Sequence, residues 1–210
     1  LEKEYLYTRK LLEMIKKDYV IEIVTKSNLV VRDVDILSES RSVVSITITT
    51  LNERLAKIIE PNAPSPKERL QVMHKLSEHD IPVTLRLDPI LPYLTDTEEN
   101  IRSIVEKASQ AGAKHLVTSI YKAKPDNMKR ILSAFPDLTD KYRSLYIEKG
   151  QRIHGYWYAP LEYRLRILKF VKEIAHEYGL TFAACREGVP FLHDRGINCD
   201  GTHLALKNVL

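Results

Sequence analysis

The sequence predicts an α/β protein in which helices cover the outside of a parallel sheet. Three observations predict this class: β-branched strands alternate with amphipathic helices, their connections are short, and no internal repeat or low-complexity linker divides the chain. A chain of 210 residues is long enough to bury one large core. We therefore expect a single domain over residues 1–210, with a βα core to residue 124 and a helical extension from residue 125.

The first half of the chain predicts strict alternation. Strands are expected where β-branched residues gather, at residues 19–24, 43–49, 82–87 and 114–120. Helices are expected where apolar residues recur every three or four positions, at residues 6–15, 33–39, 51–59, 66–79 and 97–110. The helix at residue 66 has the clearest start, because Ser65 is a good N-cap, Pro66 suits the first turn and Glu68 completes a capping box. Gly112 ends the last of these helices.

The second half of the chain does not continue the strict alternation of strands and helices. Periodic apolar residues predict helices at residues 126–135 and 141–149, followed by an aromatic-rich connector at residues 150–159. A long amphipathic helix at residues 161–178 then leads into a strand at residues 180–185. The glycine-containing tail at residues 186–206 is expected to be an ordered loop near the carboxyl-terminal edge of the sheet.

Composition limits the classes of function. A net charge of +4, from 32 basic and 28 acidic residues, permits a nucleic-acid partner without requiring one. The sequence has neither an apolar run long enough for a membrane span nor a signal peptide. Its two cysteines, Cys185 and Cys199, are too few for a disulfide scaffold. We therefore expect a cytoplasmic protein without a membrane partner.

Alternation along two strands places polar side chains on one face. Ser45, Thr47 and Thr49 share one face of the second strand, and Arg86 and Asp88 share one face of the third. The planar guanidinium of Arg86 suits a carboxylate ligand, with Asp88 as the side chain that orients it. Two alternatives remain: the hydroxyl residues could simply favour strands, and Arg86 with Asp88 could form a self-satisfied buried pair.

Two further charged residues lie near strand or helix ends. Lys26 ends the first strand at the edge where barrel active sites lie, although a lysine there can also be a solvated cation. Glu60 ends a helix, where the helix dipole disfavours negative charge. A specific partner is therefore expected for Glu60, either an arginine or the hydroxyls of a ligand.

Four segments together resemble a known family. They are Thr25-Lys26-Ser27, Ser45-Ile46-Thr47, the stretch EPNAPSPKERL at residues 60–70, and TLRLDPILP at residues 84–92. The chain resembles the radical S-adenosylmethionine (SAM) superfamily, in its spore-photoproduct-lyase-like branch, also called DNA repair photolyase-like. The resemblance covers residues 4 to 120 well and the rest weakly. It implies an open, partial (β/α)6-type barrel of about six strands that lacks its N-terminal strand.

The family's cluster-binding motif, CxxxCxxC, is missing from these 210 residues. Because the chain begins at Leu1 rather than Met, we expect an N-terminal segment with this motif to precede it. The resemblance implies that a [4Fe-4S] cluster bound there cleaves SAM to a 5'-deoxyadenosyl radical, which abstracts hydrogen from an unknown substrate. Nucleic acid is a possible substrate, and ferredoxin or flavodoxin a suitable electron donor.

The resemblance also implies roles for individual side chains. Lys26 corresponds to a lysine near the SAM carboxylate, and Ser45 and Thr47 to residues that contact its amino-acid or ribose part. The remaining expected cofactor-binding residues are Glu60, Arg86 and Asp88.

Cys185 ends the last strand on the face of Thr181 and Ala183, whose small side chains leave space beside the thiol. We expect Cys185 to be the catalytic hydrogen donor, with Cys199 or His203 approaching it as donor, relay or auxiliary-metal ligand. In the alternative, Cys185 is a small buried apolar residue and Cys199 an incidental loop thiol.

The connector and the helix after it combine aromatic and basic residues, which can stack bases and hold phosphates or can close the barrel as a core seam. These residues are Arg152, His154, Tyr156, Trp157, Tyr158, Tyr163, Arg164 and Arg166. Two other classes therefore remain open. One is a non-catalytic nucleic-acid-binding relative, and the other is a conventional barrel enzyme that acts on an anionic substrate through Arg86 and Asp88.

Overall fold

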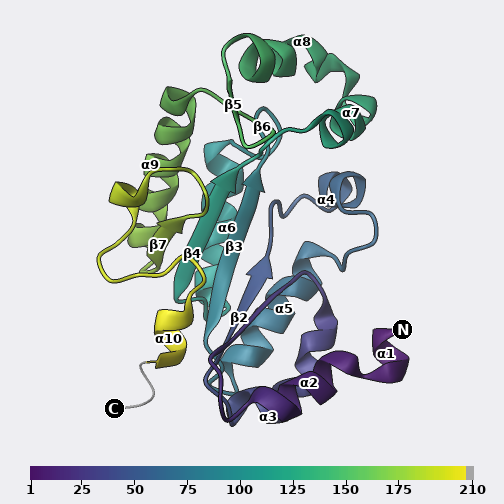
Figure 1. Cartoon of the computed structure of the whole chain (residues 1–210), viewed down its shortest axis with the longest axis vertical. Coiled ribbons are helices and arrows are strands. Elements are labelled where there is room, and N and C mark those ends of the chain that lie inside the picture. The colour runs from purple at the N-terminus through teal and green to yellow at the C-terminus, as the bar shows by residue number, and fades with distance from the viewer. Residues whose placement is uncertain (207–210) are drawn as a thin grey trace.

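The structure, a computed structural model, describes residues 1–206. Its centre is an open sheet of five parallel strands in the order β1-β2-β3-β4-β7 (Figure 1). The strands are β1 (Ile21–Thr25), β2 (Ser42–Thr47), β3 (Val83–Ile90), β4 (His115–Ile120) and β7 (Thr181–Ala184). The predicted open α/β class is confirmed, but the described residues supply five strands to the sheet instead of about six.

Helices connect successive strands, so each new strand lies parallel beside the previous one. The connecting and flanking helices are α1 (Glu2–Tyr5), α2 (Tyr7–Ile15), α3 (Val34–Ser38), α4 (Glu53–Ile59), α5 (Pro66–Ser77), α6 (Glu98–Gln110) and α9 (Leu161–Glu177). A 3₁₀ segment, Asn28–Asp33, precedes α3. The predicted capping box at α5 is confirmed: the Ser65 hydroxyl accepts from the Glu68 amide at 3.3 Å, and the Glu68 carboxylate accepts from the Ser65 amide at 2.7 Å.

The two faces of the sheet differ as the sequence predicts. Val44 and Ile46 of β2 and Leu85 and Leu87 of β3 are fully buried in one apolar cluster with residues of α5, α6 and α9. The hydroxyl and charged residues of the same strands therefore lie on the opposite face, which we call the inner face. Burial of the apolar set supplies the main driving force that holds these helices on the sheet.

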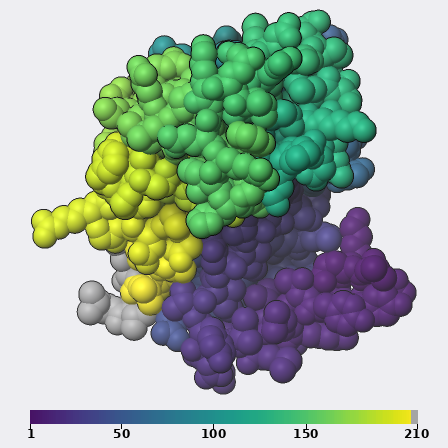
Figure 2. All heavy atoms as spheres, turned by 45° about the horizontal axis from the view of Figure 1, so that its top comes forward, coloured from purple at the N-terminus to yellow at the C-terminus, as the bar shows by residue number. Residues whose placement is uncertain are grey.

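The extension after β4 lies beyond the carboxyl-terminal ends of the strands (Figure 1). It comprises α7 (Pro125–Ala134), a 3₁₀ turn (Pro136–Leu138), α8 (Thr139–Tyr142) and a π-helical segment (Arg143–Glu148). Tyr142 and Tyr146 are fully buried in a second apolar cluster with Leu91 and Tyr121. Figure 2 shows the extension in green, gathered over this end of the molecule. Tyr163 contacts both apolar clusters, which agrees with the one-domain expectation, although that boundary stays a prediction.

Two expectations for the second half were wrong. The connector at residues 150–159 is an antiparallel hairpin of β5 (Gln151–Ile153) and β6 (Tyr156–Tyr158), turned by His154 and Gly155, which both have positive φ. The tail also contains structure of its own, a 3₁₀ turn (Pro190–Leu192) and α10 (Thr202–Leu206). No helix among residues 1–206 is long and apolar enough to cross a membrane.

Candidate functional site at the carboxyl-terminal edge of the sheet

Parallel strands bring their carboxyl-terminal ends to one edge, which is where ligands bind in open α/β sheets. Arg86 and Asp88 of β3 lie on the inner face there, and their side chains form an ion pair with Nη2–Oδ2 at 2.8 Å. Ser119, near the end of β4, donates a hydrogen bond to the other Asp88 oxygen. Arg86 also contacts Cys185, which follows β7: its Nη2 lies 3.7 Å from Sγ of Cys185. Three strands thus build one polar cluster.

The charge state of this cluster follows from its contacts. Burial alone lowers the pKa of Arg86, but Asp88 and Cys185 more than offset it, so that the pKa is raised and the guanidinium stays charged. Both contacts use Nη2, and within residues 1–206 neither Nε nor Nη1 of Arg86 makes a hydrogen bond. The side chains of Arg86 and Asp88 keep 18% and 15% of their surface exposed. Two donors of Arg86 therefore remain for a ligand, and its role in binding a carboxylate stays a prediction.

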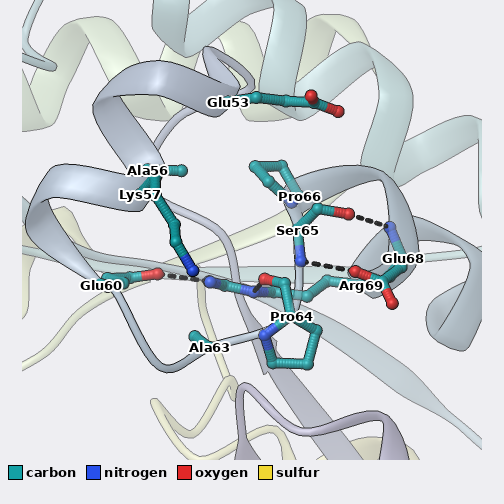
Figure 3. Close-up of a pocket in the computed structure, with 10 residues that line it drawn as sticks. All are labelled: Glu53, Ala56, Lys57, Glu60, Ala63, Pro64, Ser65, Pro66, Glu68 and Arg69. Atoms are coloured by element: carbon teal, nitrogen blue, oxygen red, sulfur yellow. Dashed lines mark hydrogen bonds and ion pairs between the residues drawn. The ribbon is translucent and has the colours of Figure 1, made fainter.

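A second charged cluster fixes the loop after α4. The Glu60 carboxylate pairs with Nη1 of Arg69 at 2.6 Å, and Figure 3 shows the two groups pointing toward each other. Arg69 is 2% exposed and also donates to the carbonyls of Pro64, at 2.9 Å, and Thr47, at 3.0 Å. The expectation that an arginine partners Glu60 is confirmed. Arg69 thereby ties the loop at residues 60–66 to the end of β2.

The sequence analysis did not identify Arg69 as a site residue, although its position in the sequence indicates that it is buried. Arg69 is spaced four residues before Met73 and seven before Leu76, so it lies on the buried stripe of α5. A charged residue on an apolar stripe requires a specific partner. Ser119 was missed as well, and the alternation of β4 that buries Val117 on the inner face would have located it.

Lys26, the residue after β1, lies near Glu60. Its Nζ lies 3.5 Å from one Glu60 oxygen, and the Thr49 hydroxyl donates to that oxygen, also at 3.5 Å. The Lys26 side chain keeps 40% of its surface exposed. Glu60 therefore has a tight buried partner in Arg69 and two long contacts that a ligand can replace.

Three hollows surround Glu60. One, of about 380 Å³, lies between α4 and the start of α5 and is the pocket of Figure 3. Another, of about 480 Å³, runs along residues 25–27 and 60–64. The third, of about 280 Å³, combines a polar rim with apolar walls, which suits an aromatic heterocycle with a polar group. Its lining includes Lys26, Thr49, Glu60, Pro89, Leu91, Tyr121 and Phe135.

Ser45 and Thr47 lie deeper than the charged residues. Ser45 is fully buried and its hydroxyl accepts from Thr84 at 2.8 Å, while Thr47 is 4% exposed. The tail covers this part of the inner face, because α10 packs against β2 and Gly201 lies against Thr84. A direct cofactor contact by Ser45 or Thr47 therefore stays a prediction.

The tail brings Cys199 to the site but takes His203 elsewhere. Burial raises the pKa of the Cys199 thiol, and the neighbouring Cys185 raises it further, so the two thiols lie in the same region, while a role for Cys199 beside Cys185 stays a prediction. The His203 ring instead packs edge-on against His115 at the amino-terminal half of the sheet, with centroids 5.1 Å apart. Within residues 1–206 no group of three or more His, Cys, Asp or Glu side chains is arranged to hold a metal ion, so an auxiliary-metal role is not supported. A [4Fe-4S] cluster, which needs three thiolates, does not fit the residues of this chain.

His115 gives the protein an expected pH dependence. Burial, together with a smaller effect of His203, lowers the pKa of His115 to about 4, so His115 is neutral near pH 7. Because the unfolded chain binds a proton near pH 6.5 and the folded chain does not, stability is lost as the pH falls from about 6.5 toward 4. We expect His115→Gln to reduce the stability lost between pH 7 and pH 4.5 by about 2–3 kcal/mol, measured by urea unfolding. The exposed His79→Gln is the matched control, and equal losses in all three proteins would contradict the assignment.

The fold is an open α/β barrel whose strands end in a cluster of charged and polar side chains. The radical SAM superfamily matches residues 2–108, and the chain belongs to this superfamily.

The chain is also similar to two uncharacterized proteins. Protein ORF301 of Acidianus two-tailed virus is 30% identical over 169 residues, which cover 73% of this chain and 56% of that protein. Protein MJ0683 of Methanocaldococcus jannaschii is 37% identical over 99 residues, which cover 47% of this chain and 38% of that protein. The chain thus spans about half the length of these relatives or less.

Solved structures with the same fold include a spore photoproduct lyase variant with bound AdoMet and dinucleoside spore photoproduct. Its TM-score is 0.68 at 16% identity, over 87% of this chain and 56% of that one. Streptococcus suis SuiB bound to S-adenosylmethionine matches with a TM-score of 0.57 at 14% identity, over 90% of this chain and 39% of that one. At these identities the likeness shows the fold.

Proposed function

We propose that the chain is the SAM-binding barrel of a radical SAM enzyme whose [4Fe-4S] cluster is held by residues outside these 210. The observation that carries the proposal is the charged Arg86, whose Nε and Nη1 are unoccupied by residues 1–206 at the carboxyl-terminal edge of a radical SAM fold. The cluster, when bound, supplies the electron that cleaves SAM to a 5'-deoxyadenosyl radical.

The side chains at the edge take distinct roles in this proposal. Arg86 binds the SAM carboxylate through one of its free donors, Nε or Nη1, and Asp88 holds the guanidinium in place through Nη2. Lys26 adds a second positive charge, and Glu60 accepts hydrogen bonds from the ribose hydroxyls once its long contacts are replaced. The adenine occupies the cavity of about 280 Å³, whose apolar walls exclude water from the base. Ser45 and Thr47 support β2 beneath the ligand.

Reconstitution tests the proposal directly. The full-length protein, loaded anaerobically with iron and sulfide and then reduced, is expected to hold one [4Fe-4S] cluster and to form 5'-deoxyadenosine from SAM. In the cell, ferredoxin or flavodoxin would supply the electron in a cytoplasmic setting. The proposal would be overturned by a full-length protein that lacks a cluster-binding motif and forms no 5'-deoxyadenosine.

Nucleic acid is the substrate class that one surface feature supports. At the β5–β6 hairpin, Nζ of Lys124, the residue before α7, lies 4.1 Å from the Tyr156 ring centroid, and the Arg152 guanidinium lies 5.7 Å from that of Trp157. Arg152 is exposed, so this part of the surface can hold a phosphate or a base. Arg164 is different: it is 4% exposed and pairs with Glu187 at 2.9 Å, as the core-seam alternative predicted for it.

The hairpin is also consistent with a second function, that of a non-catalytic nucleic-acid-binding relative. This alternative is favoured if the full-length protein cleaves no SAM but binds an oligonucleotide with an affinity that falls steeply as salt is raised.

We also propose that Cys185 donates a hydrogen atom to the substrate radical. Its thiol lies beside Arg86 at the edge, and the buried Ala183 precedes it on the inner face, so no large side chain of β7 blocks the approach. In the reconstituted full-length enzyme, Cys185→Ala is expected to retain 5'-deoxyadenosine formation but lose most product. The dinucleoside spore photoproduct, the ligand of a structural neighbour, is the first substrate to try. Cys199→Ala is the matched control for loss of a nearby thiol, and unchanged turnover in Cys185→Ala would return Cys185 to a structural role.

A further inference from the structure

A buried carboxylate, that of Glu187, lies two residues after Cys185. Its side chain is 0% exposed. Oε1 accepts from Nζ of Lys122 at 2.7 Å and from the backbone amide of Ile120 at 3.0 Å. Oε2 accepts from Nη1 of Arg164 at 2.9 Å. Both oxygens are therefore bonded, as a buried charge requires.

The bond to Ile120 extends the contact between two strands beyond the end of their ladder. β4 and β7 are paired up to Thr118 and Ala184. The Cys185 amide then donates to the Thr118 carbonyl at 2.8 Å. Two residues further along β4, the Ile120 amide donates to the Glu187 side chain in place of a strand carbonyl. Glu187 thus holds the segment after β7 against β4.

Lys122 connects this carboxylate to the backbone of Cys185. Besides its bond to Glu187, Nζ of Lys122 donates to the Cys185 carbonyl at 3.4 Å and to the Ile120 carbonyl at 3.3 Å. An ammonium group has three donors, and all three are used here. The Lys122 side chain is only 8% exposed, so its charge depends on Glu187 for compensation. Without Glu187, the contact of Lys122 with the Cys185 carbonyl would lose its support.

The backbone between Cys185 and Glu187 also needs support. Arg186 has a φ of 53°, in the left-handed region that residues with a Cβ rarely adopt. Such a conformation persists only where the surroundings impose it. The Arg186 side chain is exposed, so the conformation is held from its two neighbours. The Glu187 network holds one of them and the bond to Thr118 holds the other.

We propose that Glu187 is a positioning residue that holds Cys185 at the site. Through Lys122 it fixes the Cys185 carbonyl, and through the Ile120 amide it fixes the loop from which the thiol reaches Arg86. The catalytic consequence rests on the proposed function, in which Cys185 donates a hydrogen atom to the substrate radical. Transfer of an atom requires a close and aligned donor, so relaxation of this loop lets more radicals escape the thiol.

The yield of product per cleaved SAM tests this consequence in the reconstituted full-length enzyme, with dinucleoside spore photoproduct as the substrate. Glu187→Gln keeps the size of the side chain and removes its charge. It is expected to raise the 5'-deoxyadenosine formed per product severalfold, with the SAM affinity of the wild type. A loss of stability alone would lower both yields together, so an unchanged ratio would overturn the positioning role. In the Cys185→Ala background, Glu187→Gln should change the ratio no further, because Glu187 acts through Cys185.

Two other variants complete this test. Asp194→Asn is the matched control at the start of β7, where the Asp194 carboxylate accepts from the Phe182 amide at 2.8 Å and pairs with Nζ of Lys172 at 2.9 Å. It also loses an ion pair but should keep the wild-type ratio. Lys122→Met removes the bridge to the Cys185 carbonyl while Arg164 still pairs with Glu187. It should raise the ratio even if Glu187→Gln does not fold.

Hydrogen exchange tests the positioning role by itself, because it needs neither SAM nor a substrate. The Cys185 amide is expected to exchange severalfold faster in Glu187→Gln or Lys122→Met than in the wild type and in Asp194→Asn, measured by mass spectrometry of peptides that contain it. Equal exchange in all four proteins would overturn the positioning role. Faster exchange in the first two variants, in a protein whose wild type forms no 5'-deoxyadenosine, would support the positioning role and refute the proposed function.

Discussion

Replacing Arg69 by Met is expected to lower the free energy of unfolding by about 3–5 kcal/mol. The substitution leaves the Glu60 carboxylate without its 2.6 Å partner and the carbonyls of Thr47 and Pro64 without their donors. A buried charge that loses its partner costs more than the pair contributes, because its desolvation is no longer offset. Urea unfolding of the wild type and the variant measures the difference.

Arg102→Met is the matched control, since Arg102 pairs with Glu177 at 2.7 Å on the surface and its loss should leave the stability nearly unchanged. Adding Glu60→Gln to Arg69→Met should recover part of the loss, because the remaining buried side chain is then neutral. An Arg69→Met variant within about 1 kcal/mol of the wild type would show that the loop at residues 60–66 does not depend on this pair.

The second large effect concerns SAM itself. Neutralising both members of the central pair, Arg86→Gln with Asp88→Asn, is expected to weaken SAM binding by the reconstituted full-length protein by about 10- to 100-fold. A hydrogen bond to a charged group contributes about 1.5–3 kcal/mol, and the double change avoids leaving either charge buried alone. Equilibrium dialysis with labelled SAM measures the affinity.

Two controls complete the comparison. Arg195→Gln removes an exposed positive charge and should bind SAM as the wild type does. Lys26→Gln should give a smaller loss than the double variant, because Lys26 keeps 40% of its surface exposed and its charge is screened by water. Wild-type affinity in the double variant would exclude the cluster of Arg86 and Asp88 from the cofactor site.

Local patterns in the sequence were enough for much of the sheet. The alternation of Val44 and Ile46 with Ser45 and Thr47 is set by the geometry of a single strand, so it correctly assigned the helix-covered face. The start of α5 depends on Ser65 and three residues after it, which a capping box specifies locally. The ion pair of Arg86 and Asp88 also follows from one strand, since both side chains point to the same face.

Contacts between distant segments were harder to predict. The partner of Glu60 is on the next helix, and the packing of Gly201 against Thr84 joins the tail to the middle of the chain. No local pattern specifies either contact. The β5–β6 hairpin had a local signal that was missed: His154-Gly155 is a two-residue turn with φ of 48° and 82°, the geometry that such hairpin loops favour.

The position of SAM in a crystal structure of the reconstituted full-length protein tests the central claim most directly. We expect the SAM carboxylate within hydrogen-bond distance of Nε or Nη1 of Arg86, and the adenine in the cavity lined by Thr49, Pro89 and Tyr121. SAM bound elsewhere, with Arg86 still in contact only with Asp88 and Cys185, would contradict it.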